Sequence, residues 1–226
     1  MIIVTGASRG LGLAIATSLS EDGYDVLGVS RNAPNVPFSF DYVQGDVTSY
    51  DSLKAISRKL RDADAEVSGL VCAAGVASMN LALMTPPKVV RDVIDINLTG
   101  TIFTNQIFSK HMLRHGGAIV NFSTIAVSLA LAGESIYVSS KAGIEAFSRT
   151  FARELSANNV RVNCIAPGPI KTDLLRGVSD KQIEEIVNRQ IIKRIFEPED
   201  IVNLTSILLS KEFSSVTGEV IHVGGV

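Results

Sequence analysis

The apolar residues of this chain fall into short runs that alternate with stretches of helical periodicity. Residues 1–4 are apolar and β-prone, and Leu11, Ile15 and Leu19 then recur at helical spacing until Gly23 closes the helix. Further strands are predicted at 25–30, 38–43, 67–72, 118–124, 160–165 and 219–223, and further helices at about 52–63, 86–115, 137–155 and 198–209. This alternation predicts a doubly wound α/β fold of the Rossmann type, a three-layer sandwich with helices on both faces of a central parallel sheet.

Composition restricts the class of protein further. The 226 residues fit a single domain, 1–226, with a sizeable core. Charged residues make up 19% of the chain and the net charge is -2, so electrostatics give no reason to expect binding to nucleic acid or to an anionic membrane. The chain enters its first strand without a basic, apolar leader, and no apolar run approaches the roughly 18 residues that span a bilayer. Neither secretion nor membrane insertion is therefore expected.

The cysteines and histidines indicate a compartment and argue against a metal site. Cys72 and Cys164 lie inside apolar, strand-like runs, which predicts buried thiols in a reducing compartment, the cytoplasm, rather than a disulfide. His111, His115 and His222 have no metal-ligand spacing with one another or with the cysteines. Packed or solvated histidines are the expectation.

A glycine-rich turn joins the first strand to the first helix. Residues 5–12 read Thr-Gly-Ala-Ser-Arg-Gly-Leu-Gly and lead directly into the helical repeat. Glycines at such a turn let the backbone approach a diphosphate, and the helix N-terminus offers free N–H groups and the positive end of its dipole. An ordinary tight turn is the alternative, and only the rest of the chain can decide between them.

Tyr137 and Lys141 supply candidate chemistry. They are four residues apart, so on a helix they project from the same face one turn apart. A free tyrosine holds its proton until about pH 10, and a neighbouring cation favours the phenolate, so such a pair can exchange a proton near neutrality. Taken alone, an exposed helical pair is the commoner interpretation.

Together these motifs resemble the short-chain dehydrogenase/reductase family, in its shorter, single-domain type. The resemblance covers nearly the whole chain and is nearest to the 3-oxoacyl-acyl-carrier-protein reductases. The motifs that carry it are Thr5-Gly6-x-x-x-Gly10-x-Gly12, Asn97, Tyr137-x-x-x-Lys141 and Pro167-Gly168.

The resemblance implies a catalytic role for four residues. Tyr137 would donate a proton to the substrate carbonyl, while Lys141 lowers the pKa of that tyrosine and holds the nicotinamide ribose. Asn97 would kink its helix and hold a water that connects the lysine to solvent. The family's usual interval before the tyrosine lands on Thr124, where relatives mostly have serine, and this hydroxyl would orient the carbonyl. Ser123 is the competing assignment, because successive strand residues face opposite sides.

The end of the second strand should select the cofactor. Arg31-Asn32 stands where an acidic residue would bind the ribose of NAD and a basic one the 2′-phosphate of NADP, and Arg9 can reach the same phosphate. NADP(H) is therefore the expected cofactor. The residues expected to bind it, most of them by resemblance, are Gly6, Ser8, Arg9, Gly10, Leu11, Gly12, Arg31, Asn32, Asp46, Val47, Ala73, Ala74, Gly75, Tyr137, Lys141, Pro167, Gly168, Ile170 and Thr172.

The chain departs from the family before Ala74-Gly75. Relatives usually carry two asparagines there, whereas this chain has Cys72-Ala73. Amides that would anchor the strand are thus missing.

Residues 173–196 match the position of the family's mobile substrate lid. Their apolar side chains suit an acyl substrate, although an ordinary amphipathic helix looks the same. The expected reaction is NADPH-dependent reduction of a carbonyl to an alcohol, and the expected substrate is a 3-oxoacyl thioester. The alternatives are a short-chain dehydrogenase acting on a small alcohol, sugar or secondary-metabolite ketone, and a non-catalytic dinucleotide-binding regulator.

Partners are the least constrained expectation. Carrier-protein reductases often place arginines beside the cleft where this chain has His115 and Asn158. A substitute basic rim could come from Arg114, Lys171, Arg176 and Lys181. The substrate is thus a small molecule or an acyl thioester that a carrier protein can hold. In relatives, the helix after Lys141 and the Asn97 helix build a subunit interface, so a homotetramer or homodimer is expected.

Overall fold

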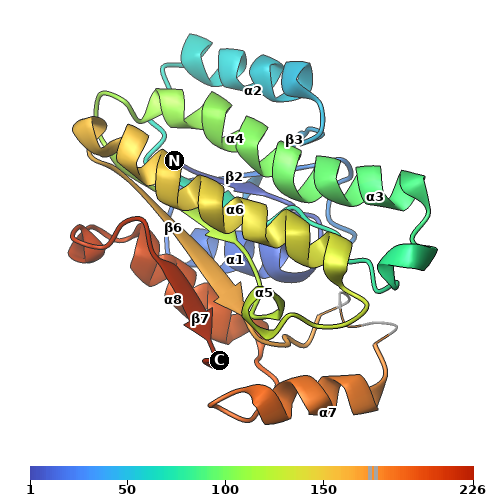
Figure 1. Cartoon of the computed structure of the whole chain (residues 1–226). Coiled ribbons are helices and arrows are strands. Elements are labelled where there is room, and N and C mark those ends of the chain that lie inside the picture. Colours follow the sequence, from blue (N-terminus) through green and yellow to red (C-terminus); the bar gives the residue numbers. More distant parts are fainter. Residues whose placement is uncertain (173–174, 176–177) are drawn as a thin grey trace.

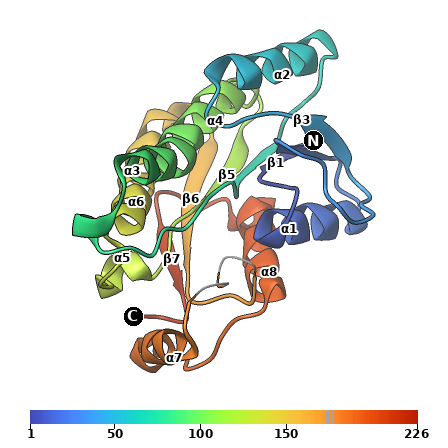
Figure 2. The same cartoon turned by 90° about the vertical axis from the view of Figure 1, so that its right-hand side faces the viewer.

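A computed structural model describes residues 1–172, 175 and 178–226, and in it the strands form one parallel sheet with helices on both faces (Figures 1 and 2). The order across the sheet is β3-β2-β1-β4-β5-β6-β7, and every neighbouring pair is parallel. The strands are β1 (Ile2–Thr5), β2 (Val26–Ser30), β3 (Asp41–Gln44), β4 (Gly69–Cys72), β5 (Gly117–Phe122), β6 (Val160–Pro167) and β7 (Val220–Val223). The predicted doubly wound fold is confirmed.

The two faces of the sheet are covered by different helices. One face carries α1 (Gly10–Glu21) and α8 (Pro198–Leu209), and the other carries α2 (Tyr50–Asp62), α4 (Gly100–Phe108) and α6 (Ser135–Glu154), as Figure 2 shows. Neighbouring strand residues point to opposite faces, so Ile3 packs on the α2/α4 side and Val4 on the α1/α8 side, and both are fully buried. This two-sided burial explains why the strands read as continuous apolar runs rather than as an alternation.

The single helix predicted at 86–115 is wrong, because the segment is divided into four pieces. It begins as α3 (Pro87–Val93), continues as the π-helical turn η2 (Ile94–Thr99) and then α4, and ends as the 3₁₀ turn η3 (Ser109–His111). Asn97 sits in the π-helical turn and is fully buried. Its side chain accepts from the Val76 N–H at 2.8 Å and donates to the Val76 carbonyl at 2.9 Å. The widened turn lets this side chain leave the helix for a loop backbone.

The third strand is shorter than its apolar pattern predicted. β3 begins at Asp41 rather than at Phe38, because Phe40 is drawn into the core beside Gly28, where a Cβ on the glycine would lie 2.5 Å from the ring. The remaining helical segments are η1 (Ala82–Met84), α5 (Ala126–Leu129), η4 (Ser156–Asn158), α7 (Asp180–Arg189) and η6 (Lys211–Phe213).

The register of the strands gathers their carboxyl ends at one edge of the sheet. Thr5 pairs with Cys72, Cys72 with Asn121, and Phe122 with Ile165. The residues that follow these positions therefore meet at a single edge, which is where open α/β sheets bind ligands. None of the helices built from the described residues is long and apolar enough to cross a membrane.

Candidate active site

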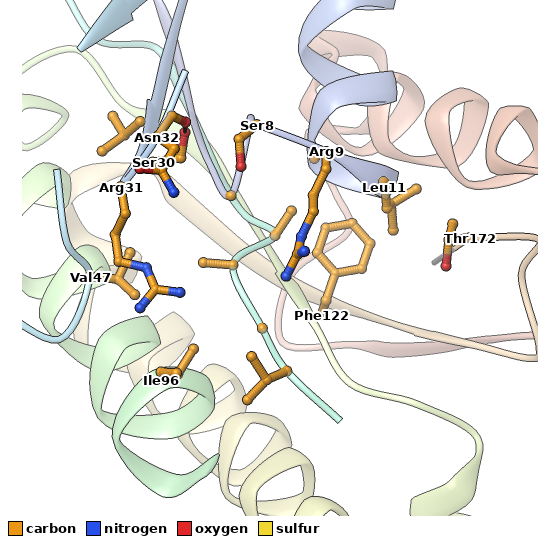
Figure 3. A pocket seen from close by; sticks show the side chains of 18 of the residues that line it. Ser8, Arg9, Leu11, Ser30, Arg31, Asn32, Val47, Ile96, Phe122 and Thr172 are labelled. Atoms are coloured by element: carbon orange, nitrogen blue, oxygen red, sulfur yellow. Dashed lines mark hydrogen bonds between the residues drawn. The ribbon is translucent and has the colours of Figure 1, made fainter. Parts of the chain in front are cut away.

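A cavity of about 490 Å³ opens at the carboxyl edge of the sheet. Figure 3 shows Arg31 at the left of the view and Arg9 near its middle, both among the side chains that line the cavity. The predicted residues that line it are Gly6, Ser8, Arg9, Gly10, Leu11, Gly12, Arg31, Asn32, Asp46, Val47, Ala73, Ala74, Gly75, Tyr137, Lys141, Pro167, Ile170 and Thr172. Asn97, Thr124 and Gly168, which were also predicted as site residues, are not among its lining residues. Ser123, the competing candidate to Thr124, also lines it. The lining residues that the sequence did not single out are Val29, Ser30, Ala33, Asn35, Gly45, Val76, Ile96 and Phe122.

The glycine-rich turn has a geometry that fits a dinucleotide diphosphate. Gly6 adopts φ +75, and a Cβ there would lie 2.7 Å from the backbone nitrogen of Ala74. Gly10 adopts φ +56 and opens α1, and a Cβ built on it would meet no atom within 4 Å. The residue before the helix, Arg9, provides no side-chain cap. The first N–H groups of α1 are thus offered to the cavity without a side chain in between.

The end of β2 carries a second hollow that continues from the cavity. Arg31, Asn32, Gly45 and Asp46 line both, and Gln44 and Ser52 complete the second one. Asp46 is occupied by its own turn, because its Oδ1 accepts from the N–H and the hydroxyl of Thr48 at 2.9 and 2.8 Å. Arg31 is exposed and supplies a positive charge at this end of the cavity.

Tyr137 and Lys141 lie together on α6 and are almost completely buried, with 8% and 6% of their surface exposed. The Lys141 ammonium is 5.8 Å from the centre of the Tyr137 ring and donates to the Phe122 carbonyl at 2.9 Å. Burial lowers the pKa of Lys141 to about 8. The ammonium therefore still carries its charge for most of the time at neutral pH.

The pKa of Tyr137 is raised, which corrects the expectation that the nearby lysine would lower it. Burial is the main cause, and the charge of Glu134 adds to it. The Thr124 hydroxyl opposes the rise through hydrogen bonding, although not enough to reverse it. In this structure Tyr137 is thus held as the neutral phenol at neutral pH, in the state of a proton donor.

Of the two candidate hydroxyls, Thr124 is the one beside Tyr137. Ser123 lines the cavity, but its hydroxyl turns inward and donates to Glu145 Oε1 at 2.6 Å. The Thr124 oxygen accepts from the Ala126 N–H at 3.2 Å and interacts with the phenol. Thr124 therefore stays the predicted carbonyl-orienting residue.

Asn97 lies close to the lysine, behind the cavity. A Cβ on Gly75 would be 3.4 Å from Asn97 Oδ1 and 3.6 Å from Lys141 Nζ, so this glycine separates the two side chains. Asn97 Nδ2 also donates to Ser140 Oγ at 3.0 Å, and that hydroxyl donates to the Tyr137 carbonyl at 2.6 Å. The proposed water relay is compatible with this position and stays a prediction.

The departure at Cys72-Ala73 is compensated by an amide from elsewhere. Asn105 on α4 donates to Cys72 Sγ at 3.3 Å and to Asn121 Oδ1 at 2.9 Å. Asn121 in turn donates to Ser148 Oγ at 2.9 Å. No sequence signal predicts this network, because its members are far apart in the chain and share no spacing.

Of the expected lid, Leu175 and residues 178–196 are described, and Leu174 and Arg176 lie outside the described residues. Its helix, α7, begins with a capping box between Ser179 and Gln182. The far end is tied down by Arg189, which donates to the Leu129 carbonyl at 2.7 Å. Of the expected basic rim, Lys171 is paired with Glu197, so it is less available to a carrier protein than the sequence indicated.

Comparison with known proteins gives consistent results over the full chain. A family model described as "Enoyl-(Acyl carrier protein) reductase" matches residues 6–225. The 3-oxoacyl-[acyl-carrier-protein] reductase FabG of Vibrio cholerae is 32% identical over 232 residues, covering 99% of this chain and 95% of its own. Its counterpart in Staphylococcus epidermidis is 34% identical over 235 residues, covering 99% and 96%.

Solved structures also match nearly the whole length of the chain. The aldohexose dehydrogenase of Thermoplasma acidophilum superposes with a TM-score of 0.89 at 28% identity, covering 99% of this chain and 92% of its own. A short-chain type dehydrogenase/reductase from Mycobacterium ulcerans gives a TM-score of 0.90 at 28% identity, covering 98% and 87%.

Proposed function

The chain belongs to the short-chain dehydrogenase/reductase family of oxidoreductases, and we propose that it reduces a carbonyl group to an alcohol with NADPH. One observation carries this proposal. The Tyr137 phenol interacts with the Thr124 hydroxyl, and the Lys141 ammonium lies 5.8 Å from the centre of the Tyr137 ring, at the carboxyl edge of the sheet and beside a cavity whose glycine turn fits a dinucleotide.

The chain's own residues account for the movement of the proton. When bound, the reduced nicotinamide supplies the hydride. Tyr137, held protonated by burial, donates its proton to the substrate oxygen as negative charge develops there. Thr124 donates a hydrogen bond to the same oxygen, and the Lys141 cation stabilises the phenolate that is left. Asn97, linked through Ser140 to the start of α6, is suited to hold the water that returns the proton.

Selection of NADP(H) over NAD(H) is supported by the charges around the cavity. Arg31 follows β2 directly and, with Ser8 and Asn32, lines the part of the cavity at the end of that strand. Arg9 adds a second guanidinium to the same cavity. Two arginines match a 2′-phosphate, whereas a ribose diol calls for a carboxylate acceptor.

We propose a 3-oxoacyl thioester as the substrate, in line with the relatives named for that reaction. The family model's description refers instead to reduction of an enoyl group, which is a carbon–carbon double bond. The Thr124 hydroxyl beside the Tyr137 phenol favours a substrate oxygen as the acceptor of the proton, and thus the 3-oxo group. The partly buried apolar residues of α7, Ile183, Ile186 and Val187, suit an acyl chain.

A sugar or small polyol is the second candidate, and Glu134 favours it. This carboxyl group lies one turn before Tyr137 and is mostly buried, and burial raises its pKa. A carboxylate beside the reacting oxygen accepts hydrogen bonds from neighbouring hydroxyls of a polyol, which an acyl chain lacks. The structural similarity to an aldohexose dehydrogenase is compatible with this candidate.

Cytoplasmic location and assembly as a homotetramer or homodimer are further parts of the proposal. Cys72 and Cys164 are buried free thiols, as in proteins of reducing compartments. Phe147 and Phe151 stack on α6 with their ring centres 5.0 Å apart, and the partly buried Phe147 continues an apolar stripe that a second subunit can cover.

Substrate competition tests the proposal. The parent protein is assayed with NADPH and acetoacetyl groups on carrier protein, on coenzyme A and on a short synthetic thioester, and with NADP⁺ and an aldohexose. The acyl proposal predicts the highest kcat/KM on a thioester. A higher value on the aldohexose would replace it with the polyol candidate, and cofactor binding without turnover of any compound would leave a dinucleotide-binding regulator.

A further inference from the structure

Three consecutive residues at the end of β5 are joined to three residues along one face of α6. The Phe122 carbonyl accepts a hydrogen bond from the Lys141 ammonium at 2.9 Å, and the Ser123 hydroxyl donates one to the Glu145 carboxylate at 2.6 Å. Thr124 interacts with the phenol of Tyr137. The α6 members are spaced by four residues and therefore share one face of the helix. Glu145 is the one member that the proposed chemistry does not use.

The contact between Glu145 and Ser123 is short and enclosed. The two residues are 8% and 3% exposed. Oε1 of Glu145 accepts the hydrogen bond from the Ser123 hydroxyl, and Oε2 lies 4.0 Å from the guanidinium of Arg149, which is about half exposed. Burying a carboxylate is costly, and an apolar side chain would fill the same space without that cost. The polar pair therefore contributes something other than packing.

Ser123 is also fixed on its other side. Its N–H donates to the Ile165 carbonyl of β6 at 2.7 Å, and two residues later the Ile125 N–H donates to the Pro167 carbonyl at 3.1 Å. Thr124 thus lies between two backbone hydrogen bonds to β6. Among the described residues, the Ser123 side chain makes one hydrogen bond, and it is to Glu145 on α6. This bond sets the distance between the Thr124 backbone and the helix that holds Tyr137.

We propose that Glu145, acting through Ser123, is a positioning residue that keeps the Thr124 hydroxyl in its reactive position beside the Tyr137 phenol. The inference rests on the proposed carbonyl reduction. Glu145 touches neither substrate nor cofactor, and its effect passes through the end of β5. A displacement of about 1 Å between reacting groups can lower a rate about 100-fold. Loss of the Ser123–Glu145 hydrogen bond should therefore have a measurable effect on the rate.

A matched control lies one turn further along the same helix. Ser148 Oγ accepts from Asn121 Nδ2 at 2.9 Å, so it also joins α6 to β5 through a buried side-chain bond. It is farther from the reacting groups. Ser148→Ala therefore removes a comparable bond from the same helix–strand contact without moving Thr124.

The test compares Ser123→Ala, Glu145→Leu, Glu145→Gln and Ser148→Ala in the full-length protein. Urea unfolding establishes that each variant is folded, and NADPH fluorescence gives its cofactor Kd. We expect Ser123→Ala and Glu145→Leu to lower kcat about 10- to 100-fold with the Kd for NADPH nearly unchanged. Glu145→Gln keeps an acceptor for the Ser123 hydroxyl and is expected to retain most of kcat, as is Ser148→Ala.

A readout without turnover separates this inference from the proposed reaction. With ¹³C-labelled threonine methyl groups, the Thr124 resonance, identified through Thr124→Ser, should shift in Ser123→Ala and Glu145→Leu but not in Ser148→Ala. An unchanged Thr124 resonance in folded Ser123→Ala would overturn the positioning role of Glu145, even if the parent protein reduces none of the carbonyl compounds tested. A loss of kcat in Glu145→Gln equal to that in Glu145→Leu also overturns it, because charge rather than the hydrogen bond would then be what matters.

Discussion

The ammonium of Lys141 donates a hydrogen bond to the backbone carbonyl of Phe122 at 2.9 Å, inside a site that is closed to most of the solvent. One neutral acceptor does not replace the hydration of a cation, and burial accordingly lowers the pKa of Lys141 to about 8. The lysine that the reaction needs is therefore also a source of instability in the free protein.

Lys141→Met is expected to remove a pH-dependent destabilisation. The ordinary pKa of 10.5 applies to the unfolded chain, and about 8 to the folded protein. Between these values the unfolded chain binds more protons, so the free energy of unfolding of the parent rises with pH, by up to about 1.4 kcal/mol per pH unit. The destabilisation is fully present below pH 8 and disappears as the pH approaches 10.5, in total roughly 3 kcal/mol.

Urea unfolding of parent and Lys141→Met between about pH 7 and pH 10 measures this effect. The difference in stability between the two proteins should narrow as the pH rises. A difference that stays constant over the range would contradict a buried, titrating Lys141.

Arg31→Asp is expected to reverse or narrow the preference for NADPH. The substitution replaces a cation at the end of β2 with a carboxylate that repels the 2′-phosphate and can accept from a ribose hydroxyl. A charge-assisted hydrogen bond contributes about 1.5–3 kcal/mol, so the Kd for NADPH should rise about 10- to 100-fold while that for NADH changes little. Fluorescence titration with both cofactors gives the two constants.

Arg58→Asp is the control for that comparison, because it makes the same change of net charge on the exposed side of α2. Its cofactor preference should equal that of the parent. Tighter binding of NADH than of NADPH by the parent itself would refute the assignment of Arg31.

Asn97→Ala is expected to destabilise the π-helical turn and the loop that it holds. The change leaves the N–H and the carbonyl of Val76 without the partners that now lie at 2.8 and 2.9 Å. Unsatisfied groups of this kind cost about 1–3 kcal/mol each, so a loss of about 2–6 kcal/mol in the free energy of unfolding is predicted for the two. Urea unfolding measures it against Asn80→Ala, an exposed asparagine in the following loop. Equal effects of the two substitutions would contradict the structural role of Asn97.

Local sequence signals predicted the parts of this molecule that local physics determines. The first strand, the glycine turn and α1 form one short unit, and Tyr137 and Lys141 meet because helical spacing brings them together. The doubly wound parallel sheet followed from the regular alternation of strands and helices. These features need no knowledge of distant contacts.

Tertiary contacts decided the features that the sequence did not predict. The π-helical turn exists because Asn97 reaches Val76, which is 21 residues away. Asn105 compensates for Cys72 across 33 residues, and Glu145 reaches Ser123 across 22. The raised pKa of Tyr137 reflects burial, which no spacing reveals.

The most direct test of the account is the rate of NADPH oxidation by parent and Tyr137→Phe on an acetoacetyl thioester. Removing the phenolic hydroxyl takes away the proton donor and leaves the ring and the cavity in place, and positioned acids contribute about 10²- to 10⁴-fold to a rate. We predict a fall of kcat by that order, with the Kd for NADPH nearly unchanged. A Tyr137→Phe protein that turns over at close to the parent rate would contradict the assignment of Tyr137 as the proton donor.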